Sequence, residues 1–462
     1  MLMAVFVATV LISTICGTPV GAGLLGACLG TLIYQVITGF KSPVFISNSG
    51  ATVSAVLGAL ILSAVAKVTA LGVDASGYQT IGGIVYAYDS LGNVITSTPV
   101  NYFAVFVGGL VILAVYGIFA LIIKLRGIDA INKLFPPYIV GPITIVIGLN
   151  LAGFIPTYVG IGQGDANIGV LVAISVMLCV ALTSHYFKGF LKTIPFLIGL
   201  FFGFVMCLVL ELLIPDLAFG VSADGSPITI LEQLKQVDGF FTIPDFTFLH
   251  WADGFNSFGL DILLNVILLF APVAICALCE HYSDHAVMSN IIGHDLTKDP
   301  GLDKTLLGDG VASVVGTIFG GQPNTSYGES TAMVGFSRVA SVKVVSLAAV
   351  MMGILAFIEP VQVFINAIPS CVFGGCAMIL YGYIACSGLK TLMRNKVDLE
   401  NNKNLVVVSV ILTVGVSGIW LFSNSFAGVS LAMVLGILLN LLLKDHKKEQ
   451  LPSDFESNQP QN

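Results

Sequence analysis

The sequence predicts an all-α polytopic membrane protein with about 14 transmembrane segments. Its composition is the first reason. Of the 462 residues, 56% are hydrophobic and only 10% are charged, with a mean hydropathy of +0.96, whereas a soluble domain carries roughly 25% charged residues. The second reason is a series of apolar runs of roughly 15 to 25 residues, the length that crosses a bilayer core. A soluble globular protein is therefore excluded.

The apolar runs follow one another along most of the chain. They lie near residues 2–16, 19–39, 43–67, 102–123, 136–156, 166–186, 193–215, 260–282, 305–321, 326–340, 344–365, 368–390, 404–422 and 426–443. The third and the tenth are interrupted by small and polar residues, at 47–50 and 324–329. Irregular backbone inside a bilayer has to face protein or a water-filled cavity. These two segments are therefore expected to line a polar cavity.

Lysine and arginine give the orientation, because they concentrate in cytoplasmic loops. With a cytoplasmic N-terminus, the fourteen segments place nearly all of them inside: Lys41, Lys124, Arg126, Lys133, Lys188, Lys192, Lys298, Lys304, Arg338, Lys343, Lys390, Arg394, Lys396, Lys403, Lys444, Lys447 and Lys448. Only Lys67 and Lys235 fall outside. Both termini and the polar tail 445–462 are therefore predicted to be cytoplasmic. The long loops near 68–101 and 216–259 are predicted to be external, with turns or hairpins.

The chain begins on apolar residues without the basic stretch of a signal peptide. We expect a first membrane helix that is shortened at its start. We also expect a multi-pass protein of the plasma membrane, which in a bacterium is the inner membrane.

The sequence also contains a faint internal repeat. One copy is Phe135-Pro136-Pro137 with Gly141 and Gly148, and the other is Ile368-Pro369-Ser370 with Gly374 and Gly382. Seven segments separate the copies, which indicates a 7+7 inverted repeat with a binding site near the midplane. Recurrence of proline and glycine at helix starts is the alternative.

Two carboxylates, Glu280 and Glu329, lie inside apolar sequence. A carboxylate at bilayer depth is costly and marks a functional site by default. The pair predicts a polar cavity for a small hydrogen-bonding solute, and hence a transporter. An enzyme is disfavoured, because the sequence offers no nucleophile–base set, metal cluster or phosphate-binding loop. Nine cysteines fall in apolar runs and are expected to be reduced packing residues; no metal site, cofactor or nucleic-acid partner is predicted.

Several motifs resemble the uracil permease branch of the nucleobase–cation (nucleobase–ascorbate) symporters. The most specific is Asn324-Thr325-Ser326-Tyr327-Gly328-Glu329; the others are Glu280-His281 with Asp284 and Asn290, Asp295-Leu296, Asp299-Pro300-Gly301-Leu302, Gly30-Thr31-Leu32-Ile33-Tyr34, Leu134-Phe135-Pro136-Pro137, Ile147-Gly148-Leu149, Leu380-Tyr381-Gly382 and Gly415-Val416-Ser417-Gly418. The resemblance implies a core domain from residues 1–130 and 260–366 and a gate domain from 131–259 and 367–444. It also implies short antiparallel strands in segments three and ten that hold the substrate.

Uracil presents two N–H donors and two carbonyl acceptors, so its site needs carboxylate acceptors and fixed backbone donors. We expect Glu280 and Glu329 to accept, and the backbone N–H groups of Gly50 and Gly328 to donate. Similarity adds Tyr327, Ala8 and Tyr381 as residues that line the pocket or face the gate. A carboxylate shielded from water takes up a proton more readily. Proton coupling is therefore assigned to Glu280, Asp284, His281 and Glu329, and sodium coupling stays open.

The chain departs from the family pattern at three places, and the last of them keeps a second substrate class open. Asp284 stands where some relatives carry histidine, so the proton relay of this chain differs from theirs. Glu329 is followed by Ser330-Thr331-Ala332, and Gly50-Ala51-Thr52 replaces the usual aromatic residue of the third segment. A missing aromatic enlarges the pocket, so the expected proton-coupled uracil importer has a purine (xanthine or uric acid) symporter as its alternative.

An anion exchanger on the same scaffold is a less favoured interpretation of the chain. Individual polar residues also have structural interpretations: either glutamate, Glu280 or Glu329, could be a structural anchor, and Asp309 is interpreted as a structural polar residue. A homodimer through the gate domain, within the lipid bilayer, is a further expectation from related transporters.

Overall fold

The computed structural model describes residues 1–71, 73, 75, 77–81, 84–89, 94–127, 135–160, 166–214, 217–221, 227–417, 419–421 and 426–443. The predicted tail 445–462 lies outside the described residues, as do Lys133, Lys444, Lys447 and Lys448. The side chain of Glu329 also lies outside them, although its backbone belongs to a described helix.

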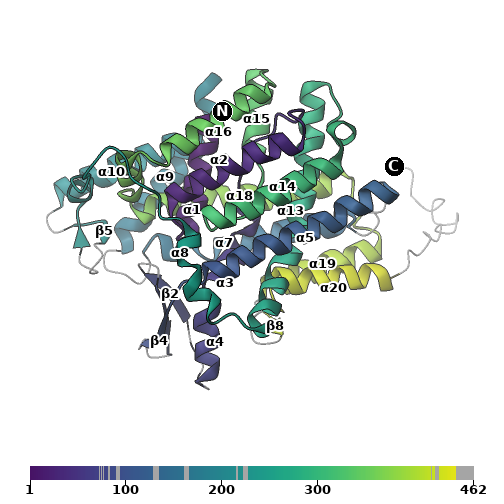
Figure 1. Ribbon diagram of the computed structural model, residues 1–462, viewed down its shortest axis with the longest axis horizontal. Coiled ribbons are helices and arrows are strands. Elements are labelled where there is room, and N and C mark those ends of the chain that lie inside the picture. Colours follow the sequence, from purple (N-terminus) through teal and green to yellow (C-terminus); the bar gives the residue numbers. More distant parts are fainter. Residues whose placement is uncertain are drawn as a thin grey trace, which may run out of the picture.

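One group of helices packs around α2, α5 and α14, which run side by side in Figure 1. We call it the core group. Its helices are α1 (Leu2–Cys16), α2 (Val20–Ile37), α3 (Val53–Leu60), α5 (Tyr102–Arg126), α13 (Leu260–Ile292), α14 (Leu302–Phe319), α15 (Gly328–Ser337) and α16 (Val342–Leu355). The 3-10 turn η1 (Gly50–Thr52) leads into α3, and α4 (Leu62–Ala70) continues from it.

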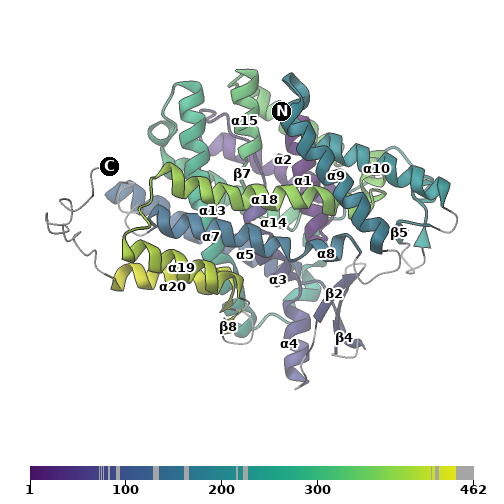
Figure 2. The ribbon, with the colours of Figure 1, turned by 180° about the vertical axis from the view of Figure 1, so that it is seen from behind.

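A second group, the gate group, packs around α7 and α18, with α9 and α10 to one side and α19 and α20 on the other (Figure 2). Its helices are α7 (Pro137–Ala152), α8 (Ile155–Tyr158), α9 (Ala166–Tyr186), α10 (Pro195–Leu213), α18 (Ser370–Arg394), α19 (Asn402–Val416) and α20 (Val429–Leu442). Contacts between α7 and α18 are close at Gly148, where an added Cβ would lie 2.6 Å from Ala385 N and 2.7 Å from Tyr381 O. Only glycine leaves the two backbones room to approach this far.

Each predicted apolar segment overlaps at least one helix. Among the described residues, eight helical stretches are long and apolar enough to cross a membrane: Val20–Ile37, Gly50–Ala70, Tyr102–Arg126, Pro137–Tyr158, Asn167–Tyr186, Pro195–Leu213, Leu260–Ile292 and Ser370–Arg394. Four more apolar helices are shorter: Val5–Cys16, Val342–Leu355, Asn402–Val416 and Val429–Leu442. The chain is a multi-pass helical membrane protein, and the count of fourteen spans in a 7+7 repeat stays a prediction.

The two interrupted segments pair with each other. Strand β1 (Ile46–Asn48) is antiparallel to β7 (Asn324–Ser326), with Ser47 opposite Thr325. All six strand residues are buried, so their backbone groups need protein partners. Thr31 Oγ1 provides one by donating to Ile46 O (2.6 Å) and accepting from Ile46 N (3.1 Å). These are the antiparallel strands that the family resemblance implied.

The predicted hairpins of the loop near 68–101 are present as a three-stranded antiparallel sheet. Its strands are β2 (Gly77–Ile81), β3 (Ile84–Tyr88) and β4 (Val94–Pro99), in that order. Two smaller pairs are β5 (Gly220–Val221) with β6 (Pro227–Ile228) and β8 (Trp420–Leu421) with β9 (Phe426–Ala427). The remaining short helical elements are η2 (Gly189–Thr193), α11 (Ile230–Leu234), η3 (Thr247–His250), α12 (Trp251–Phe255), η4 (Thr297–Gly301) and α17 (Glu359–Asn366).

Residues 247–255 lie in the range predicted for the gate domain, yet they pack on the core group. Thr247 Oγ1 donates to the carbonyl end of α14, at Thr317 O, Ile318 O and Phe319 O. The Trp251 ring stacks on Phe106 of α5, with ring centroids 4.2 Å apart. An aromatic contact therefore fixes this loop to α5, which the prediction of turns or hairpins near 216–259 does not anticipate.

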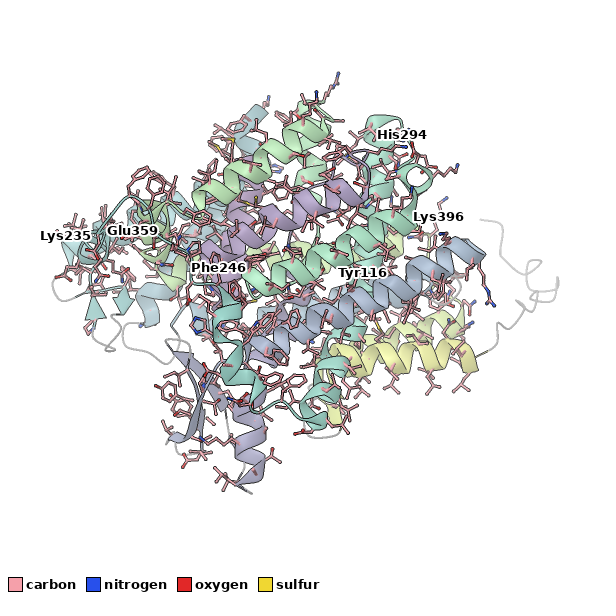
Figure 3. All side chains as sticks on the ribbon, viewed as in Figure 1. Tyr116, Lys235, Phe246, His294, Glu359 and Lys396 are labelled. Carbon is pink, nitrogen blue, oxygen red and sulfur yellow. The ribbon has the colours of Figure 1, made fainter. Side chains whose placement is uncertain are left out.

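Loops predicted to face opposite sides of the membrane lie at opposite ends of the molecule. In Figure 3, His294 and Lys396, from loops predicted to be cytoplasmic, are at one end of the long axis, and Lys235, from a loop predicted to be external, is at the other. At the His294 end, Lys41 Nζ lies 2.6 Å from Asp299 Oδ1 and joins two loops of the core group. The hydrogen bond from Lys41 holds the pKa of the Asp299 carboxyl below its usual range.

Candidate functional site

A cavity of about 500 Å³ lies between the core and gate groups. Its core-group lining is Ile12, Gly50, Ala51, Cys276, Glu280, Ser283, Asp284, Thr325, Ser326, Tyr327, Gly328 and Ala332. Its gate-group lining is Thr144, Ile147, Leu380, Tyr383, Ile384, Ser387 and Lys390. The structure thus brings together five predicted site residues from positions far apart in the chain: Glu280, Asp284, Gly50, Tyr327 and Gly328.

Two carboxylates enter the cavity from one helix. Glu280 and Asp284 are four residues apart on α13, which puts them on one face, one turn apart. Ser326 Oγ donates to Asp284 Oδ2 at 3.0 Å and fixes that carboxylate beside β7. Asp284 Oδ1 lies 3.6 Å from the position of an added Cβ at Gly328. The cavity therefore presents two carboxyl groups, both hydrogen-bond acceptors, next to the start of α15.

Each strand of the buried pair is followed by a helical turn that begins at glycine. Gly50 opens η1 and α3, and Gly328 opens α15. The first N–H groups of a helix have no partner inside it, and its amino end carries partial positive charge. Both glycines line the cavity, so backbone donors from two helix starts converge on the space that the carboxylates face. An added Cβ at Gly50 would lie 3.5 Å from Ile384 Cδ1 of the gate group.

The gate-group lining of the cavity was not predicted from the sequence. Five of its residues, Leu380, Tyr383, Ile384, Ser387 and Lys390, recur on α18 at intervals of three and four, which places them on one face of the helix. That interval was readable from the sequence. It does not separate a cavity face from a packing face, because both follow the same helical period.

Three predicted site residues lie elsewhere. Ala8 and Tyr381 are buried, with 4% and 2% of their surface exposed, and are not part of the cavity lining. The Tyr381 hydroxyl has no hydrogen-bond partner among the described residues. His281 adjoins Glu280 in sequence, but it points into the core group and has no exposed surface. Glu329 follows Gly328 at the start of α15, with its side chain outside the described residues.

His281 belongs to a buried polar network behind the cavity wall. Its Nδ1 lies 2.7 Å from Asp309 Oδ2, and its Nε2 lies 3.1 Å from Thr305 Oγ1. Thr325 Oγ1 donates to the same Asp309 oxygen at 3.1 Å. The ring of His285 packs against that of His281, with centroids 4.0 Å apart and the planes tilted by 31°. The structure thus gives Asp309 a specific histidine partner, which the sequence could not identify.

A second cavity, of about 550 Å³, lies toward the other end of the core group. Polar side chains dominate its lining: Thr14, Thr18, Tyr102, Asp245, His250, Asp253, Gln362 and Asn366. Helix α1 runs from one cavity to the other, since Ile12 lines the first and Thr14 the second. Between the groups, Tyr158 Oη donates to Ile15 O at 2.7 Å. This bond ties α8 of the gate to α1 of the core.

Comparison with known proteins identifies relatives over nearly the whole chain. A family model described as the permease family matches residues 1–423. The uracil permease of Bacillus caldolyticus is 33% identical over 466 residues, covering 99% of this chain and 93% of that protein. The uracil permease of Escherichia coli (strain K12) is 30% identical over 450 residues, covering 96% and 89%.

Solved structures of membrane transporters share the fold. The transmembrane domain of the cyanobacterium bicarbonate transporter BicA has a TM-score of 0.57 at 13% identity, covering 95% of this chain and 94% of that one. The murine anion transporter Slc26a9 in the inward-facing state has a TM-score of 0.57 at 12% identity, covering 96% and 66%. At such identities the likeness concerns the fold alone. The chain therefore belongs to the permease family and is a multi-pass membrane transporter, not an enzyme.

Proposed function

We propose that this permease imports uracil together with a proton by alternating access across the plasma membrane. The cavity between the core and gate groups is the observation that carries the proposal, because two carboxylates and two helix starts face the same space. The relatives named uracil permease, similar over nearly their full length, support the choice of substrate.

The polar groups of the cavity match those of a pyrimidine ring. Glu280 and Asp284 accept hydrogen bonds from ring N–H groups, and the backbone N–H groups that begin at Gly50 and Gly328 donate to ring carbonyls. Glycine at both places lets the ring approach the backbone. Aliphatic side chains from the gate, Ile147 and Ile384 among them, cover the ring face. Such a site holds a small, flat, neutral ligand in one orientation.

The charge of the cavity argues against an anionic ligand. Glu280 and Asp284 face one cation, Lys390, among the residues that line it. An anion entering this space meets like charge, which costs several kcal/mol in a poorly solvated site. A neutral nucleobase that donates hydrogen bonds meets no such cost. The same argument disfavours the anion-exchanger alternative.

Alternating access accounts for the position of the two cavities. The central cavity extends along α18 to Lys390, near the end of that helix predicted to be cytoplasmic. At the other end, the hydrogen bond from Tyr158 to Ile15 joins gate to core. We infer that the structure is inward-facing, closed on the external side by this contact. Rocking of the core group against the gate group exposes the site to either side in turn.

Uptake of labelled uracil tests the substrate and the driving force. Cells lacking their own uracil carrier and expressing this chain should show saturable uptake that unlabelled xanthine does not reduce and that a protonophore abolishes. Strong competition by xanthine would assign the site to purines, in keeping with the space left by Gly50. Absence of uracil uptake with the protein present in the membrane would refute the proposal.

Tyr158→Phe tests the external closure. Removing one neutral hydrogen bond costs the closed state about 1 kcal/mol, so the outward-open population should rise roughly fivefold. Cys16, which is buried beside Ile15, reports the opening when the cells are treated with a membrane-impermeant maleimide. Labelling should be faster in Tyr158→Phe than in the parent, and this difference should vanish when Cys16→Ser is introduced into both. Equal rates in the parent and the variant would show that Tyr158 does not hold the external side closed.

A further inference from the structure

The strongest unexplained feature of the core group is a buried acid–imidazole pair outside the cavity. His281 and Asp309 have no exposed surface, and their side chains meet at 2.7 Å. Asp309 Oδ1 has no hydrogen-bond partner among the described residues, although the backbone amide of Ser326 lies near the carboxyl. A buried polar atom without a partner is rare enough to need an explanation.

The pair can hold one extra proton. An ionised Asp309 beside a neutral His281 leaves one net negative charge buried. One added proton makes the pair neutral, whether it sits on the imidazole or on the carboxyl group. Burial of net charge is costly, so protonation relieves the pair. The two groups are close enough to share this proton as one unit.

The groups around the His281–Asp309 pair favour this pair, and not its neighbours, as the place where an added proton binds. His285 is the nearest other base, but its Nδ1 donates to His281 O (2.8 Å) and its Nε2 lies 2.6 Å from Tyr34 Oη. A neutral His285 is satisfied at both nitrogens when Tyr34 Oη, which also lies 2.9 Å from Ser42 Oγ, donates to Nε2. The adjacent ring of His281, with its centroid 4.0 Å away, opposes a second imidazolium. Among the described residues, the other titratable groups around the network are Tyr34 from α2, Tyr116 from α5, and Glu280 and Cys279 from α13.

Strand β7 connects the pair to the cavity. Thr325 lines the cavity and donates to Asp309 Oδ2. The next residue, Ser326, donates to Asp284 Oδ2 inside the cavity. Two neighbouring residues of one strand thus hold the buried carboxyl on one side and a cavity carboxyl on the other. A change of charge at Asp309 alters the first bond and shifts the strand that carries the second.

We propose that the His281–Asp309 pair carries the coupling proton, while Glu280 and Asp284 bind the nucleobase. This inference rests on the proposed function, proton-coupled nucleobase import. Glu280 is exposed to the cavity, so a proton held there exchanges with water whenever the cavity is open. The buried pair is shielded in the inward-facing structure. A sodium ion prefers oxygen ligands, and the imidazole N–H directed at Asp309 opposes it.

The test uses the full-length protein in liposomes and two assays of labelled uracil. The first is exchange of internal for external uracil, which needs no net proton movement. The second is accumulation driven by a pH gradient, where one proton per uracil and about one pH unit give about tenfold accumulation. Asp309→Asn and His281→Gln should keep exchange near the wild-type rate and lose accumulation, to a ratio of about one. The double variant should be no worse than either single variant, since the two groups act as one.

Tyr138→Phe is the control, because it removes a partly buried hydrogen bond of similar length (2.6 Å, to Asn440 Oδ1) from the gate group. It should leave both assays unchanged. A second measurement, calorimetry of uracil binding in buffers of different ionisation enthalpy, should show proton uptake in the wild type and none in His281→Gln. Because this measurement compares the wild type with His281→Gln, it still tests the proposal if Asp309→Asn does not fold.

Three results would overturn the assignment. Accumulation that persists in both variants would remove the pair from coupling. Loss of exchange together with accumulation, in protein that elutes and melts like the wild type, would make the pair a structural element. Accumulation driven by sodium without a pH gradient would exclude a coupling proton. A wild-type protein that does not move uracil would instead refute the proposed function.

Discussion

Glu280→Gln should lower the affinity for uracil by roughly 10- to 150-fold, because a hydrogen bond to a charged acceptor contributes about 1.5–3 kcal/mol. The substitution keeps the size of the side chain. It replaces one anionic oxygen with an NH₂ group that faces a ring N–H, donor against donor. The dissociation constant from calorimetry on the purified protein measures the effect, and the initial rate of uracil uptake should fall with it.

Asp261→Asn is the control for this prediction. Asp261 is an exposed acid in the first turn of the same helix, α13, and it takes no part in the cavity lining. Its substitution should leave uracil affinity unchanged. Wild-type affinity in Glu280→Gln, combined with lost transport, would contradict the binding role and move Glu280 to the coupling step.

Gly148→Ala should destabilise the protein by about 1–3 kcal/mol, the usual cost of forcing an extra group into a packed contact. The new methyl group would lie 2.6 Å from Ala385 N and 2.7 Å from Tyr381 O, both backbone atoms of α18. Backbone cannot rotate away as a side chain can, so α7 and α18 must separate. Both helices line the cavity, and uracil transport should decline as well. Thermal melting of the detergent-solubilised protein measures the loss of stability.

Gly117→Ala serves as the comparison. Gly117 lies inside α5, and nothing is within 4 Å of the position of its added Cβ. Alanine has the higher helix propensity, so this variant should melt at the wild-type temperature or above it. If Gly148→Ala melts with the wild type, the close approach of α7 and α18 does not hold the gate group together.

The polar interruptions at 47–50 and 324–329 were predicted to line a polar cavity, because irregular backbone is costly in lipid. The sequence did not reveal that they pair, because antiparallel partners so far apart leave no local pattern; only the family resemblance supplied that. Glu280 and Glu329 were identified from the cost of a carboxylate in apolar sequence, whereas Asp284 was identified through the family resemblance.

The rest of the site depends on tertiary packing. Asp309 is 28 residues from His281, on another helix, and nothing in either local sequence specifies their contact. The same holds for the gate face of α18, which shares its period with ordinary packing faces. Residues 247–255 were assigned to the gate by position in the chain, while the Trp251 ring attaches them to α5.

Because β1 pairs with β7, the first strand is synthesised long before the partner with which it forms a sheet. A ribosome adds roughly 5–20 residues per second, so β1 enters the membrane on the order of ten seconds or more before β7 exists. During that interval Thr31, already synthesised, can occupy both the N–H and the C=O of Ile46 with its hydroxyl group. One threonine thus protects the early strand within its own chain, and the cavity closes only when the late strand arrives.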